Sequence, residues 1–151
     1  MKKLIVSLCF ICLFATAFSQ SHEEKKERIN ALKIAFITEH LNLTESEAQK
    51  FWPIYNAYEE KDDQLKKTSA NTRKRISLEF DSLSNKEAES LLNDVIENAN
   101  TRHKLHVNYI NSLREVFSAK KIILLKQIED DFKRKMFEEF KKRRQERKNK
   151  P

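Results

Sequence analysis

Residues 43–55 read LTESEAQKFWPIY, and this stretch predicts where a long helix begins. Thr44 and Glu47 have the spacing of a capping box, in which the Thr44 hydroxyl accepts a hydrogen bond from the Glu47 amide. The Glu47 carboxylate accepts one in turn from the Thr44 amide. Leu43 precedes the box and apolar residues follow it, so we expect a helix to start directly after Thr44.

A second copy of this motif lies further along the chain. Residues 83–88 read LSNKEA, with Ser84 and Glu87 at the two capping positions. The Leu, the hydroxyl residue, the Glu and the Ala recur at the same spacing as in residues 43–48. We interpret the pair as a structural repeat that starts two helices.

The composition favours long helices joined by short links. The chain has no Gly, and of its two Pro residues only Pro53 lies in its body. We expect an all-α protein, an elongated bent hairpin of about four helices without a β-sheet. The predicted helices cover about 23–40, 45–80, 85–117 and the residues from 119 onward, the last of them capped by Ser118.

The second of these helices contains two irregular features. Pro53 lacks an amide hydrogen, which predicts either a kink or a break of the helix near Phe51 and Trp52. Residues 59–75 are polar on every side apart from Leu65. We expect this polar middle either to be exposed or to pair with another chain.

Apolar residues repeat at helical spacing in the two last helices. The third helix carries a stripe that includes Leu91, Leu92, Val95 and Leu113. The last helix carries Ile122, Leu125, Ile128, Phe132, Met136 and Phe140. A single hairpin has too few partners to cover apolar stripes on two faces, so we expect a homodimer.

The N-terminus predicts export. Two lysines precede an uncharged apolar run from Leu4 to Phe18, which is typical of a signal peptide cleaved near Ser19 and Gln20. We therefore expect a signal peptide at 1–19, a helical domain at 20–140 and a basic tail at 141–151, with the mature protein in the periplasm. Both cysteines lie in the predicted signal peptide, which excludes disulfides and thiolate sites from the mature chain.

The positive charge is concentrated at the C-terminus. Between Lys133 and Lys150 there are ten basic and three acidic residues. A solvated helix end, an anionic membrane surface and an acidic protein patch all remain open as explanations. Export argues against nucleic acid as a partner. The candidate electrostatic residues of the tail are Lys141, Lys142, Arg143, Arg144 and Arg147.

Large aromatic residues are candidates for contacts with unfolded or envelope proteins. Such side chains can grip an apolar segment of a client, although they can equally form the core. The candidates are Phe51, Trp52, Tyr55, Tyr58, Phe132 and Phe140.

The sequence indicates neither an enzyme nor a cofactor site. Glycine-dependent phosphate loops and nucleophile elbows are excluded, and carboxylates alternate with Lys and Arg as on solvated helix faces. His103 and His106 are three positions apart and are weak candidates for a metal site, without a third ligand at a fixed spacing.

Three segments resemble a known family. LTxxEAxKFWPxY from Leu43, LRxVFSxK from Leu113 and ExxFxR from Glu129 resemble the Bacteroidetes branch of the periplasmic Spy/CpxP-like proteins, often described as sensors of ECF-type sigma factors. The resemblance covers most of the mature chain. Glu47 stands where the first Leu-Thr-x-x-Gln motif of the family has its Gln.

The resemblance implies a bent helical hairpin, often an antiparallel dimer, whose concave face holds unfolded clients or touches an envelope-stress sensor. The expected function is that of an ATP-independent holdase chaperone or a stress-signalling accessory. The alternatives are a structural or regulatory partner of a membrane sensor without chaperone activity, and a metal-sensing helical protein.

Overall fold

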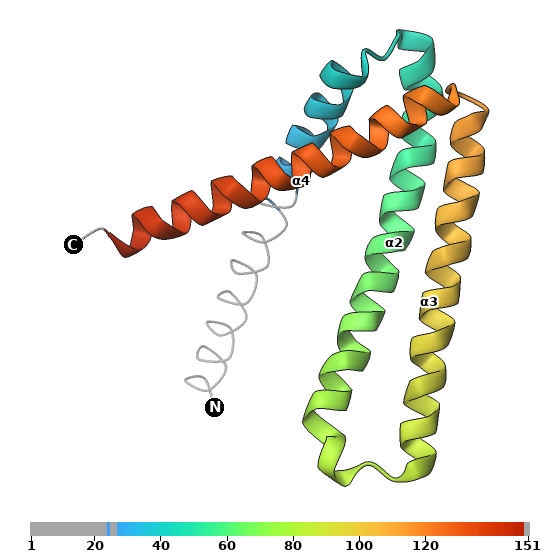
Figure 1. The fold of residues 1–151 in the computed structure, drawn as a ribbon, viewed down its shortest axis with the longest axis vertical. Helices are drawn as coiled ribbons and strands as arrows, with labels where there is room; N and C mark the ends of the chain where they lie inside the picture. Colours follow the sequence, from blue (N-terminus) through green and yellow to red (C-terminus); the bar gives the residue numbers. More distant parts are fainter. Residues whose placement is uncertain (1–23, 25–26, 150–151) are drawn as a thin grey trace, which may run out of the picture. The chain divides into compact units, whose positions relative to one another are not determined.

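The computed structural model describes residue 24 and residues 27–149, and every regular element in that part of the chain is a helix (Figure 1). The predicted all-α class with about four helices is confirmed, and the described residues contain no strand. The elements are a helix over 27–41, α2 (Glu45–Glu79), the 3-10 helix η1 (Phe80–Ser82), α3 (Asn85–Arg114) and α4 (Ala119–Lys148). The predicted signal peptide at 1–19 lies outside the described residues. Among the helices that are described, none is both long enough and apolar enough for a membrane span.

The chain divides into two compact units. One runs from Leu43 to Leu124, and the other combines the residues up to Asn42 with those from Leu125 onward. The predicted border between a domain at 20–140 and a tail at 141–151 falls inside α4, which continues through Lys148. The basic residues from Lys141 to Lys148 are therefore part of a helix.

The unit from Leu43 to Leu124 is built on a helical hairpin. α2 and α3 lie side by side and run antiparallel, with η1 at the turn between them (Figure 1). At 1.5 Å per residue, the 35 residues of α2 span about 52 Å and the 30 residues of α3 about 45 Å.

Hydroxyl caps start all three long helices, as the sequence predicts. The amide of Glu47 donates to Thr44 Oγ1 at 3.2 Å, and the Thr44 amide donates to Glu47 Oε2 at 2.9 Å. The second box repeats this geometry, at 3.3 Å for the Glu87 amide to Ser84 Oγ and 2.9 Å for the Ser84 amide to Glu87 Oε2. Ser118 Oγ accepts from the Lys121 amide at 3.3 Å at the start of α4.

α2 continues without interruption through Pro53, so the break offered as one outcome of that proline does not occur. A proline inside a helix removes one backbone hydrogen bond. Pro53 itself is exposed, whereas Phe51 and Tyr55 on either side of it are buried. Burial of those two rings stabilises the helix on both sides of the proline.

Each unit buries its own apolar residues. In the hairpin unit most of the buried apolar side chains gather where α2 begins and α3 ends, whereas Leu91 lies near the turn. The buried apolar residues of this unit are Phe51, Tyr55, Leu91, Tyr109, Leu113, Phe117 and Ile122. In the other unit they come from the helix over 27–41 and from α4: Ile37, Leu41, Leu125, Ile128 and Phe132. The Phe36 ring lies 5.6 Å from the Phe132 ring, which brings these two helices together.

The helix over 27–41 ends at Asn42, close to the predicted end near residue 40. Asn42 has φ 47°, in the left-handed region that Asn tolerates better than most residues other than Gly. Its amide donates to the carbonyl of Glu39 at 3.4 Å. The asparagine therefore replaces the glycine that usually ends a helix in this way.

Candidate functional site

The aromatic residues after the first capping box form a cluster that is largely core. The Phe51 ring centroid lies 4.7 Å from that of Trp52, 5.2 Å from Tyr55 and 5.3 Å from Phe117. Phe51 and Tyr55 are buried, so they present no surface to a client in this structure, whereas Trp52 is half-buried. Of the two roles considered for these aromatic residues, client contact and core, Phe51 and Tyr55 therefore have the core role.

Tyr58 continues this aromatic row towards α3. Its ring stacks on Tyr109 with centroids 4.0 Å apart and an interplanar angle of 8°. Its hydroxyl lies 3.2 Å from Nδ1 of His106. The two tyrosines and the histidine thus join α2 to α3, and half-buried Tyr58 is part of the hairpin interface.

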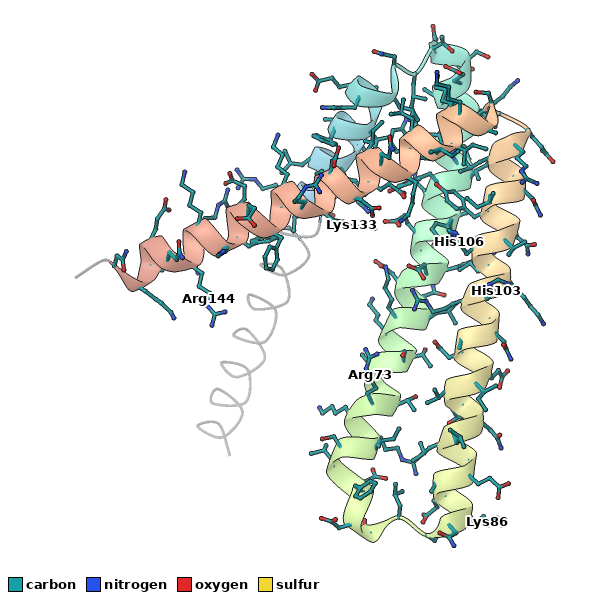
Figure 2. The ribbon with its side chains drawn as sticks, in the orientation of Figure 1. Arg73, Lys86, His103, His106, Lys133 and Arg144 are labelled. Atoms are coloured by element: carbon teal, nitrogen blue, oxygen red, sulfur yellow. The ribbon has the colours of Figure 1, made fainter. Side chains whose placement is uncertain are left out.

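The two candidate metal ligands have different surroundings. His103 and His106 both lie on α3 (Figure 2), but Nδ1 of His106 is already within hydrogen-bonding distance of Tyr58. The described residues contain no group of three or more His, Cys, Asp or Glu side chains placed to hold a metal ion. The geometry therefore adds no third ligand to the pair.

The two capping boxes differ in one contact. Nζ of Lys121 lies 2.8 Å from both carboxylate oxygens of Glu47, which ties the start of α2 to the first turn of α4. This hydrogen bond, together with the Thr44 amide, lowers the pKa of Glu47 from 4.5 to about 2. The Ser84 hydroxyl and amide also lower the pKa of Glu87. Glu47 therefore serves as both a cap and an ion-pair partner.

The polar middle of α2 packs on α3 of the same chain. Asp62 is buried, and its Oδ1 accepts from Nε of Arg102 at 3.0 Å. Lys66 Nζ lies 2.7 Å from the other oxygen of Asp62, and Nδ2 of Asn98 donates to the Leu65 carbonyl at 3.1 Å. The expectation that this segment is exposed or pairs with another chain is therefore wrong for Asp62, whereas most of the other residues from 59 to 75 are exposed.

These contacts also set the charge state of Asp62. Burial by itself raises the pKa of this carboxyl. The hydrogen bonds from Lys66 and Arg102, together with their positive charges, lower the pKa by more than burial raises it, so the net pKa lies below its usual value. Asp62 is therefore ionised at neutral pH in spite of its burial. Single-sequence periodicity could not reveal Asp62 and Arg102, because a polar pair between two helices leaves no apolar repeat.

The hairpin leaves large apolar side chains exposed. On α3, Leu92, Val95, Ile96 and Val107 lie on one side of the helix and are 59%, 43%, 51% and 41% exposed. We call these four residues the α3 apolar face. Leu78 and Phe80, beside the turn, are 74% and 71% exposed. Within the predicted apolar stripe of α3, Leu91 and Leu113 are buried, whereas Leu92 and Val95 are exposed.

The C-terminal half of α4 also departs from its predicted pattern. Phe132 is buried against Phe36, but Phe140 is 50% exposed. Phe137, which is not among the predicted contact residues, is 66% exposed. The basic residues beyond them are exposed along the same helix, where Figure 2 labels Arg144. An exposed aromatic pair therefore stands next to a cluster of cations.

Comparisons with family models, with curated proteins and with solved structures found no match to this chain.

Proposed function

We propose that this chain is an exported envelope protein that binds other proteins, as an ATP-independent holdase or as an accessory in envelope-stress signalling. The proposed location is the periplasm, where nucleotide is not available to drive release. Clients would therefore leave through weak and reversible contacts.

The α3 apolar face is the observation that carries this proposal. A monomer usually buries most of its large aliphatic side chains, and contiguous exposed ones mark surfaces that bind proteins or membranes. Leu92, Val95 and Ile96 follow one another at helical spacing on a single side of α3. Such a row suits an extended or helical segment of a client.

The polar contacts between α2 and α3 support the same proposal. Asp62 with Arg102, and Asn98 with the Leu65 carbonyl, join the two helices through polar contacts in the middle of the hairpin. Leu92, Val95, Ile96 and Val107 are more than 40% exposed on α3. Their exposed area is available to a partner.

An anti-aggregation assay tests the proposal with several unrelated denatured proteins. We expect the parent chain to keep them in solution, and Leu92→Ser/Ile96→Ser to lose most of this protection, because the double change removes apolar contact area. Asn93→Ser/Asn100→Ser, at exposed polar positions of the same helix, is the matched control and should protect as the parent does. Equal protection by both variants would contradict a role for the α3 apolar face.

Protection of none of the denatured proteins would favour the alternative, a structural or regulatory partner of a membrane sensor. The α3 apolar face can also receive a second copy of the chain, and we include a homodimer in the proposal. Light scattering at tens of micromolar measures this directly. A monomeric mass for the parent would contradict the dimer while leaving the client assay unaffected.

A further inference from the structure

The last turns of α4 carry two exposed phenylalanines and three cations on one side of the helix. At 100° per residue, these side chains fall within an arc of about 100°. Phe137 and Phe140 are 66% and 50% exposed, and the three cations are exposed as well. We call this set the basic-aromatic face: Phe137, Phe140, Arg144, Arg147 and Lys148.

The acidic residues of this segment lie elsewhere around the helix. Glu138, Glu139 and Glu146 are each rotated by more than about 120° from the centre of the basic-aromatic face. The face itself therefore has three positive charges and no negative one. This segregation along a helix of mixed composition produces a local positive potential beside apolar surface.

Earlier cations of α4 are neutralised locally, in contrast to those of the face. Lys133 lies 3.4 Å from Asp130, and Arg134 forms an ion pair with Asp131. Within the described part of the chain, the three cations of the face take part in no such ion pair. Their charge is thus available to an external anionic partner.

We propose that the basic-aromatic face docks this protein on an anionic lipid surface. A bilayer interface offers negative headgroups directly beside hydrocarbon, which matches cations that flank phenylalanines. The 12 residues from Phe137 to Lys148 extend over about 18 Å, so the helix lies along the surface. The long stems of Arg and Lys can bury their methylene groups while their charges stay at headgroup level.

Both kinds of side chain are needed for this choice of partner. An acidic polypeptide would use the cations and leave the exposed phenylalanines without a role. An apolar groove in a protein would use the phenylalanines and gain nothing from three unpaired charges. The inference goes beyond the proposed protein binding and is independent of the α3 apolar face.

Vesicle co-sedimentation of the full chain tests the docking. Vesicles of phosphatidylcholine with about one third phosphatidylglycerol are compared with phosphatidylcholine alone. We expect binding that requires phosphatidylglycerol and weakens as salt is raised. Binding that is the same on both vesicle types would overturn the proposal.

Two double variants that each replace one Arg and one Lys then test whether vesicles bind to the basic-aromatic face. Arg144→Gln/Lys148→Gln should reduce the partition constant about 20- to 30-fold, since each basic residue at an anionic surface contributes about fivefold. Arg143→Gln/Lys142→Gln removes the same two residue types from outside the face and should reduce it less than about fivefold. Equal losses in the two variants would overturn the assignment to this face. Binding that other parts of the chain provide is common to both variants and cancels in the comparison.

The aromatic pair separates lipid from acidic protein. Phe137→Ser/Phe140→Ser should lower vesicle binding at least about tenfold, because phenylalanine contributes by leaving water. Unchanged vesicle binding by this variant, or salt-sensitive binding to polyglutamate that exceeds binding to vesicles, would overturn the lipid proposal. Arg144→Gln/Lys148→Gln, which leaves both phenylalanines and the α3 apolar face in place, should protect denatured clients as the parent does, so failure here is distinguishable from failure of the proposed function.

Discussion

Replacement of Phe51 by Ala tests whether the aromatic cluster of α2 is core. The Phe51 side chain is 0% exposed and has the Trp52, Tyr55 and Phe117 rings 4.7, 5.2 and 5.3 Å away. Loss of a fully buried phenylalanine leaves a cavity and lowers the free energy of unfolding by about 3–5 kcal/mol. For a chain of this size, the melting temperature should fall by about 6–20 °C.

Urea denaturation followed by far-UV circular dichroism measures this effect. Phe51→Leu is a milder variant that should lower the free energy of unfolding by about 1 kcal/mol. It can still be compared with the parent if Phe51→Ala does not fold. Phe80→Ala is the matched control, because it removes the same side chain from a position that is 71% exposed, and it should change stability by less than about 0.5 kcal/mol. An unfolding free energy for Phe51→Ala within about 0.5 kcal/mol of the parent, together with lost client protection, would refute the core role.

Three further predictions concern the caps and the polar contacts. Thr44→Ala and Ser84→Ala should each lower the unfolding free energy by about 1 kcal/mol in urea titrations, and a loss below about 0.3 kcal/mol would show that the hydroxyl is dispensable. The folded pKa of Glu47 is about 2 against a usual 4.5, so its contribution is complete above pH 4.5 and disappears as the pH falls towards 2. Acid titration of Glu47→Gln should therefore show a smaller loss of stability over that range than the parent, and parallel curves would contradict the ion pair. A double-mutant cycle of Asp62→Asn and Arg102→Gln should give a coupling of about 1 kcal/mol, since Arg102 is partly exposed, and additive effects would rule the contact out as a source of stability.

The helix starts could be predicted because they are local. Thr44, Ser84 and Ser118 each find their hydrogen-bond partners three residues further along the chain. Such contacts need no knowledge of tertiary packing.

The buried faces of the helices could not be predicted in the same way. Leu91 and Leu92 are neighbours of the same type, yet one is buried and the other 59% exposed. Which of them faces α2 depends on contacts across the hairpin such as Asp62 with Arg102, which are 40 positions apart in sequence. Apolar spacing alone assigns both residues to one stripe.

Only one of the two exposed phenylalanines of α4 could be predicted, for a related reason. Phe132 and Phe140 continue one pattern along the helix, but only the environment decides which is covered. Phe36 lies against Phe132, whereas Phe140 is half-exposed and has Phe137 next to it on the helix surface. Selection of aromatic residues by spacing therefore named one member of the exposed pair and omitted the other.

The polar contacts in the middle of the hairpin limit how its length can change. A slip of α3 along α2 by one helical turn would move Arg102 about 5.4 Å from the buried Asp62 carboxylate and Asn98 by the same distance from the Leu65 carbonyl. An aliphatic interface would tolerate such a slip better, because its contacts are not directional. Insertions or deletions between these contacts and the turn should therefore preserve the fold only when α2 and α3 gain or lose the same whole number of helical turns. Homologous hairpins should differ in length by such equal changes in both helices.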